Sequence, residues 1–114
     1  MVLWALENSL GGEIFVPKIP SMRILDLVES VAPGCRVEVI GIRPGEKLHE
    51  ALIAEEESRQ VVELDDLFVL EPIYPSWAFA GHEGGQRPGA GFRYSSEANT
   101  QWLSPAAMKE LARD

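Results

Sequence analysis

The stretch RVEVIGIRPGEKLHEALIA, residues 36–54, governs the predicted fold of this chain. Its first part, Arg36 to Ile42, begins with the alternation of apolar and polar residues that is typical of a half-buried strand. Pro44 and Gly45 then favour a tight turn, and the residues from Glu46 to about Ala54 favour a helix. The stretch therefore predicts a strand, a turn and a helix in that order.

The residues before this stretch complete a predicted α/β unit. Glu13 to Val16 has the composition of a short strand, and Ser21 is placed to cap a helix over about Met22 to Ala32. Strand, helix and strand then occupy about thirty residues, the size of a crossover unit that is nearly always parallel and right-handed. We expect an α/β fold: a small parallel βαβ unit, additional helices and a strand pair.

Further elements are predicted on both sides of this unit. Val2 to Leu10 is expected to be helical, and Gln60 to Leu64 with Leu67 to Leu70 is expected to form the strand pair. Residues 71–91 are rich in Gly and Pro and predict a long irregular loop. Ser104 and Pro105 are typical of the start of a helix, here continuing to Arg113. Residues 1–114 are expected to form a single domain.

Composition excludes several classes of function. The chain has ten Lys and Arg residues and 18 Asp and Glu residues, which gives a net charge of −8. This charge disfavours nucleic-acid binding, because affinity for nucleic acids rests on basic side chains. Cys35 is the single cysteine, so neither an internal disulfide nor a cysteine metal site is possible. No apolar run approaches the roughly 20 residues of a membrane span. We expect a cytoplasmic protein.

Arg43 is the strongest candidate for ligand binding. It follows the predicted strand, at the edge where α/β folds bind ligands, and its guanidinium suits a phosphate or a carboxylate. Gly45 would allow close backbone approach, and Glu46 could accept hydrogen bonds from a sugar diol. The alternative is structural: Arg43 pairs with Glu46 or Glu50, and Pro44-Gly45 is only a turn.

The remaining candidates carry weaker signals. Lys18 lies in a proline-stiffened loop and either meets an anion or is simply solvated. His49 and His82 lack metal-type partners at a suitable spacing and are expected to be ordinary surface or packing residues. The glycines from Gly81 to Gly91 do not lie between a strand and a helix, so they form no dinucleotide-binding fingerprint.

Three segments carry a resemblance to a known family: GGEIFVPKIPSMRILDL at 11–27, GIRPGEKLHEALI at 41–53 and FRYSSEANTQWLS at 92–104. They resemble, in the same order, the C-terminal portion of inverting UDP-N-acetylglucosamine 4,6-dehydratases. These enzymes belong to the extended short-chain dehydrogenase/reductase superfamily and to the polysaccharide-biosynthesis dehydratases. The resemblance implies the smaller, substrate-binding lobe of such an enzyme, without its Rossmann domain.

The resemblance also implies an activity for the complete enzyme, a lyase of bacterial surface or flagellar glycan biosynthesis. Bound NADP takes a hydride from sugar carbon 4, water is lost across carbons 5 and 6, and the hydride returns to carbon 6. In the family, the NADP loop and the Tyr-x-x-x-Lys pair lie in the N-terminal domain. This chain is therefore expected to contain no catalytic residue, no cofactor site and no metal site, and to be inactive alone.

Carried over by position, the resemblance gives roles to four residues. Arg43 would contact the phosphates or ribose of UDP or of a UDP-sugar, and Glu46 would contact the ribose or Arg43. The loop from Lys18 to Ser21 would border the substrate cleft. The first helix would be the end of a helix that begins earlier in full-length relatives.

Two other functions remain open. The chain could be a non-enzymatic oligomerisation or protein-interaction module, since a lobe without its Rossmann partner would expose an apolar face. Candidates for that face are Leu3, Trp4, Trp77 and Phe79, and a homo-oligomer or a covering partner is expected. Alternatively, a separate chain could supply the missing domain and restore activity in trans.

Overall fold

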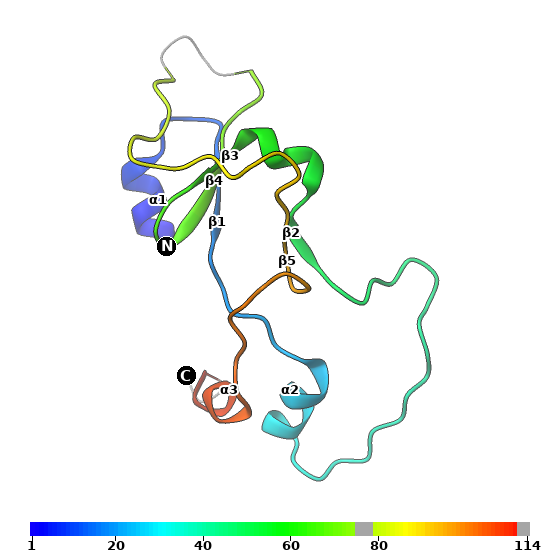
Figure 1. Ribbon diagram of the computed structural model, residues 1–114. Helices are drawn as coiled ribbons and strands as arrows, with labels where there is room; N and C mark the ends of the chain where they lie inside the picture. Colours follow the sequence, from blue (N-terminus) through cyan, green and yellow to red (C-terminus); the bar gives the residue numbers. More distant parts are fainter. Residues whose placement is uncertain (75–78, 112–114) are drawn as a thin grey trace. The chain divides into compact units, whose positions relative to one another are not determined.

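A three-stranded antiparallel sheet forms the centre of the first of two units (Figure 1). The computed structural model describes residues 1–74 and 79–111. Unit 1 comprises Met1–Lys18 and Ala51–Tyr94, and unit 2 comprises Ile19–Glu50 and Ser95–Asp114. Each unit thus joins two separate pieces of the chain.

The sheet of unit 1 has the order β1 (Ile14–Pro17), β4 (Leu67–Leu70), β3 (Val61–Glu63). Leu70 of the central strand lies opposite Ile14 on one side and Val61 on the other, and both pairings are antiparallel. The predicted strands at 13–16, 60–64 and 67–70 are therefore confirmed. The predicted parallel arrangement is wrong, because the partner of β1 is the antiparallel strand β4.

Every residue of β4 is buried, since both faces of the sheet are covered. One face holds Phe68, whose ring centroid lies 5.1 Å from that of Phe92 and 4.9 Å from that of Tyr94. On the other face, α1 (Val2–Asn8) places Trp4 edge-on against Phe15 of β1, with centroids 5.5 Å apart. A strand buried on both faces explains the continuous apolar run of Leu67–Leu70.

The connection from β4 to β5 (Tyr94–Ser95) is fastened to unit 1 at several described residues. Gln86 exchanges two backbone hydrogen bonds with Glu63, at 2.7 and 2.9 Å. Gly85 lies so close to β3 that a Cβ atom on it would meet Val62 Cγ1 at 2.1 Å. The Arg87 guanidinium donates to the Glu71 carboxylate and also to the Arg59 carbonyl at 3.3 Å. Residues 79–91 are thus irregular but attached.

Unit 2 contains a pair of helices, α2 (Ile24–Val31) and α3 (Pro105–Leu111). Ser30 Oγ lies 2.7 Å from the Asp26 carbonyl oxygen and 3.1 Å from the Pro105 carbonyl oxygen, and it joins the two helices. Ser104 Oγ accepts from the Ala107 amide at 3.3 Å, so the predicted start of the last helix is confirmed. Its predicted end at Arg113 lies outside the described residues.

The predicted strand over residues 36–42 does not form. Gly41 has φ of +86°, a conformation that interrupts an extended strand, and no described segment pairs with these residues. Every residue from 31 to 50 is exposed, and Figure 1 shows the chain between α2 and β2 (Ala51–Ile53) as a long stretch of coil. A strand needs a neighbour to satisfy its backbone, and this segment lacks one within the described chain.

The predicted helix over Glu46 to Ala54 is also wrong. Residues Ala51–Ile53 instead form β2, which pairs with β5, and a 3-10 helix, η1, follows at Glu55–Gln60. The Ser96 amide donates to the Glu50 carbonyl at 2.9 Å, and the Glu50 amide donates to Ser96 Oγ at 3.2 Å. Pairing with a segment that is distant in sequence outweighs the local helix propensity of this stretch.

The predicted helix cap at Ser21 is wrong as well. Helix α2 begins at Ile24, and the preceding residue, Arg23, is extended with φ of −87° and ψ of 136° and makes no side-chain cap. Ser21 is extended too, and forms a parallel bridge with Trp102. Its hydroxyl accepts from the Asn99 side chain at 3.0 Å, and no side-chain hydrogen bond caps α2. Among the described residues, no helix is both long and apolar enough to cross a membrane.

Candidate functional site

The turn from Arg43 to Glu46 is closed by two reciprocal hydrogen bonds. The Glu46 amide donates to the Arg43 carbonyl at 3.0 Å, and Glu46 Oε2 accepts from the Arg43 amide at 2.7 Å. Gly45 has φ of +85°, which a residue with a side chain rarely adopts. Pro44 and Gly45 thus set the backbone of a turn, and the Glu46 carboxylate holds it shut.

The Arg43 side chain leaves this turn into solvent. Within the described chain, no carboxylate lies within ion-pair distance of its guanidinium, including those of Glu46 and Glu50. The structural alternative, an ion pair from Arg43 to one of these glutamates, is therefore not what the geometry shows. Glu46 contacts the backbone of Arg43 rather than its side chain. The arrangement leaves five guanidinium N–H donors available to an anion.

Ser21 is tied to the third signature segment. Its amide donates to the Gln101 carbonyl at 2.9 Å, and its carbonyl accepts from the Leu103 amide at 2.9 Å. The Asn99 side chain donates to Ser21 Oγ at 3.0 Å and to the Ile19 carbonyl at 2.8 Å. Asn99 was not predicted from the sequence, where nothing distinguishes it from any other polar residue of a loop.

His49 ties the second signature segment to the third. Its Nδ1 lies 3.2 Å from Ser96 Oγ, and Ser96 also exchanges hydrogen bonds with the neighbouring Glu50. All three signature segments therefore contribute to unit 2, with residues 95–104 joined to each of the other two. His49 is exposed and hydrogen-bonded to Ser96, as expected for an ordinary surface histidine.

Lys18 belongs to unit 1 and has a partner there. Its Nζ lies 2.8 Å from Glu63 Oε1 of β3 and 5.0 Å from the centroid of the Phe68 ring. Its amide donates to the Asp66 carbonyl at 3.0 Å. Lys18 is therefore neither free in solvent nor unpaired, and an anion at this residue would compete with Glu63.

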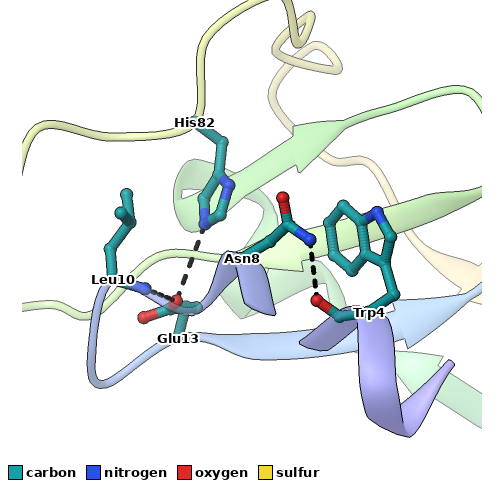
Figure 2. A network of polar contacts seen from close by, with 5 residues as sticks. All are labelled: Trp4, Asn8, Leu10, Glu13 and His82. Carbon is teal, nitrogen blue, oxygen red and sulfur yellow. Dashed lines mark hydrogen bonds and ion pairs between the residues drawn. The ribbon is translucent and has the colours of Figure 1, made fainter. Parts of the chain in front are cut away.

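A second polar cluster, which the sequence did not suggest, surrounds Glu13 (Figure 2). Its fully buried carboxylate accepts from the Leu10 amide and lies 3.7 Å from His82 Nε2. Burial raises the pKa of Glu13, but hydrogen bonds from the Leu10, Glu13 and Gly11 amides and the Ser9 hydroxyl outweigh it and leave the pKa below its usual value. His82 packs edge-on against Phe15, at a centroid distance of 5.6 Å. The cluster attaches the loop at His82 to the start of β1.

The described residues do not fit the cofactor that the resemblance implies for the complete enzyme. A dinucleotide site needs a Gly-rich turn between a strand and a helix. The glycines from Gly81 to Gly91 follow β4 and precede β5, so the element directly after them is a strand and not a helix. Among residues 1–74 and 79–111, no three His, Cys, Asp or Glu side chains are grouped as metal ligands.

The aromatic residues proposed for an exposed face differ in position. Trp4 is partly exposed but packs against Phe15, and Phe79 is half-buried, with its ring 6.4 Å from that of His82. Leu3 is 76% exposed, as expected for a residue of such a face. The prediction for Trp77 lies outside the described residues.

Comparison with known proteins gives relatives for nearly the whole chain. The inverting UDP-N-acetylglucosamine 4,6-dehydratase of Campylobacter jejuni is 40% identical over 96% of this chain and 35% of its own length. The UDP-glucose 4-epimerase of Rickettsia canadensis is 29% identical over 97% of this chain and 34% of its own length. This chain therefore spans about a third of the length of these relatives.

A solved structure agrees with this relationship. The X-ray structure of Pen from Bacillus thuringiensis matches 97% of this chain and 34% of its own chain, with a TM-score of 0.72 and 29% identity. The profile of the polysaccharide biosynthesis protein family matches residues 1–72. The chain thus belongs to the polysaccharide biosynthesis protein family, and its sequence is similar to those of inverting UDP-N-acetylglucosamine 4,6-dehydratases, as the three signature segments predicted.

Proposed function

We propose that this chain is the UDP-sugar-binding portion of a UDP-N-acetylglucosamine 4,6-dehydratase that serves bacterial surface or flagellar glycan biosynthesis in the cytoplasm. The Arg43 guanidinium is the group that contacts the diphosphate. The observation that carries this proposal is the exposed Arg43 side chain, which leaves a rigid turn without a carboxylate partner in the described chain. A planar guanidinium recognises phosphate and carboxylate through paired hydrogen bonds, and a diphosphate supplies the phosphate oxygens.

The distribution of charge supports unit 2 as the site of an anionic ligand. Unit 1 contains ten of the 18 acidic residues and only four of the ten basic ones, whereas unit 2 contains the other six. A diphosphate approaching the chain therefore meets less repulsion at unit 2. Those six basic residues are Arg23, Arg36, Arg43, Lys47, Lys109 and Arg113.

The names of the relatives support UDP as the recognised group. A UDP-N-acetylglucosamine dehydratase and a UDP-glucose epimerase differ in reaction and in sugar, but both take a substrate linked to UDP. A chain similar to both is therefore expected to hold what their substrates share.

In this proposal, Glu46 contributes to binding by holding the turn at Arg43 closed. One oxygen of its carboxylate already accepts from the Arg43 amide, so the carboxylate fixes the backbone from which the Arg43 side chain extends. The second oxygen remains available to a ribose hydroxyl. Ser21 borders the substrate in the proposal, whereas Lys18 belongs to unit 1, where it pairs with Glu63. NADP and the acid–base residues belong to another part of the enzyme, so this chain does not catalyse the reaction by itself.

Calorimetric titration of UDP into the full chain tests the proposal, with Arg43→Ala, Arg43→Lys and a control in parallel. Arg43→Ala should weaken binding about tenfold to a hundredfold, the loss expected for hydrogen bonds to a charged group. Arg43→Lys should retain part of the affinity, because lysine keeps the positive charge but lacks the planar guanidinium that can form two parallel hydrogen bonds. Arg36→Ala removes an exposed arginine of the same segment and should bind normally. Equal affinity in Arg43→Ala and wild type would refute the role of Arg43.

A second candidate function, an oligomerisation or interaction module, rests on a different observation. Residues 31–50 are exposed throughout, and several of them are large and apolar: Val37, Val39, Ile40, Ile42 and Leu48. Apolar surface of this kind is usually covered by a partner. Light scattering after size-exclusion chromatography distinguishes the two candidate functions. A stable oligomer in the wild type that is absent in Val39→Lys would favour the interaction module. A monomer at all concentrations would disfavour it.

A further inference from the structure

The segment from Cys35 to Ile40 has the composition of a strand but no strand partner. The chain makes neither a turn nor a bend over these residues, and every one of them is exposed. Val39 is 87% exposed and Ile40 is 71% exposed, although β-branched side chains fit best on a half-buried sheet. Gly41, with φ of +86°, interrupts the strand conformation directly afterwards. Nothing within the described chain therefore uses the strand pattern of these residues.

The backbone of this segment is open to a partner strand. Among the described residues, no amide or carbonyl group from Arg36 to Ile40 takes part in a hydrogen bond of the chain. An exposed row of such groups is a template for pairing with another strand. Unit 2 has eight acidic and six basic residues and so carries only two of the eight excess negative charges. Two copies that meet through unit 2 therefore repel each other little.

The order of residues in this segment is self-complementary in one antiparallel register. When Val37 of one copy lies opposite Val37 of the other, Arg36 lies opposite Glu38 of the other copy, and symmetry repeats this ion pair. Cys35 then lies opposite Val39, so the second face of the pair is apolar throughout. Opposite charges that face each other across two strands stabilise the pair.

Neighbouring registers lack this complementarity. A shift by two residues in one direction places Glu38 opposite Glu38, and the same shift in the other direction places Arg36 opposite Arg36. Like charges directly opposite each other destabilise a strand pair. A shift by one residue places the apolar Val37 opposite one of these charged residues. The sequence of the segment thus favours one antiparallel register over those on either side.

We propose that residues 35–39 are an interaction surface whose partner is a second copy of this chain, and that the two copies form an antiparallel strand pair centred on Val37. The inference rests on the second candidate function and deepens it, because it names the partner and the contact, and it does not require UDP binding. Two short strands form a small interface, so the dimer should dissociate reversibly on dilution. The turn at Arg43 lies outside the paired residues.

Sedimentation equilibrium of the full chain over a range of concentrations measures the dissociation constant of this dimer. Arg36→Glu and Glu38→Arg each place like charges opposite each other twice, and each should weaken the dimer about tenfold. The double variant Arg36→Glu/Glu38→Arg restores both ion pairs and should regain the wild-type dissociation constant. Glu110→Arg makes the same change of net charge at an exposed position of α3 and should dimerise as the wild type does.

Disulfide trapping reports the register of the pair. Val39→Cys places a thiol opposite the native Cys35 of the other copy, and oxidised glutathione should convert this variant into a covalent dimer. Opposite residues of an antiparallel pair have Cβ atoms about 4.5–5.5 Å apart, close to the separation in a disulfide. Ile40→Cys is the matched control, because its thiol lies opposite Gly34, and it should cross-link little. Cys35→Ser in the Val39→Cys background should abolish the covalent dimer.

The results separate the strand pair from the two candidate functions. A chain that stays monomeric at every concentration refutes both the strand pair and the second candidate function, while UDP binding is decided by its own titration. A dimer that neither charge variant weakens, or that Ile40→Cys traps as well as Val39→Cys does, forms through another surface or register and overturns the strand pair alone. All substituted side chains are exposed, and circular dichroism checks that each variant is folded.

Discussion

At the scale of single residues, glutamates have a structural role that the net charge of −8 conceals. Glu13, Glu46 and Glu57 each accept a hydrogen bond from the backbone amide three residues earlier, at Leu10, Arg43 and Ala54. Each carboxylate thereby satisfies an amide at a bend of the chain, as the glutamate of a capping box does. Part of the acidity of this chain is therefore used to fix its turns.

Glu13 should make the stability of unit 1 depend on pH. Its pKa in the folded chain lies below the usual 4.5, so the stability it contributes is present above that pH and is lost as the pH falls through the folded pKa. We expect the difference in unfolding free energy between wild type and Glu13→Gln to shrink as the pH is lowered below about 4.5. Urea denaturation at a series of pH values measures this difference in unfolding free energy. A difference that stays constant from neutral to acidic pH would contradict a stabilising role for the ionised Glu13 carboxylate.

Gly85 should tolerate no side chain. A Cβ atom there would lie 2.1 Å from Val62 Cγ1 and 3.2 Å from the Glu63 carbonyl oxygen. Gly85→Ala should therefore cost about 1–3 kcal/mol of unfolding free energy, the range for overpacking. Gly89 has no atom within 4 Å of the equivalent position and is the matched control, with Gly89→Ala expected to change stability by less than about 0.5 kcal/mol. Equal effects in chemical denaturation would show that the loop is not packed against β3.

At the scale of elements, prediction from the sequence succeeded where local signals agree with the pairing that forms. The strands at 61–63 and 67–70 are rich in Val, Leu and Phe, and they are near each other in sequence, so the local pattern is sufficient. The strand over 36–42 and the helix over 46–54 were predicted wrongly. Gly41 interrupts the first, and the distant residue Ser96 draws Glu50 into strand-like pairing in the second. Contacts with distant residues are not visible in a local pattern.

Ser30 should couple α2 to α3 energetically. Its side chain is buried and reaches the carbonyl oxygens of Asp26 and Pro105, so removal of the hydroxyl leaves the Pro105 carbonyl without this contact. Ser30→Ala should lower the unfolding free energy by about 1 kcal/mol, a typical value for one hydrogen bond. Glu29→Ala, at an exposed position of the same helix, serves as the control and should have a small effect. No difference between the two variants would mean that packing alone joins the helices.

At the scale of the whole molecule, the signature segments act together although their predicted elements were partly wrong. Segments around residues 21, 49 and 99 meet in unit 2 through Ser21–Asn99 and His49–Ser96. The sequence identified Arg43 and Glu46 as candidates from their place after a predicted strand and Ser21 through the resemblance, but it could not show that Glu46 holds the turn or that Asn99 holds Ser21. Lys18 belongs to unit 1, where it forms an ion pair with Glu63. The sequence thus named candidate residues but not the residues that contact them.

The central claim is that unit 2 holds UDP, and amide NMR of the labelled full chain during UDP titration tests it most directly. We expect the shifts to concentrate on residues 42–47, to include other residues of unit 2, and to disappear from 42–47 in Arg43→Ala. Unit 1 should remain unchanged and serve as the reference within the same spectrum. A well-dispersed spectrum that UDP leaves unmoved at millimolar concentration, or one in which only unit 1 responds, would contradict the account.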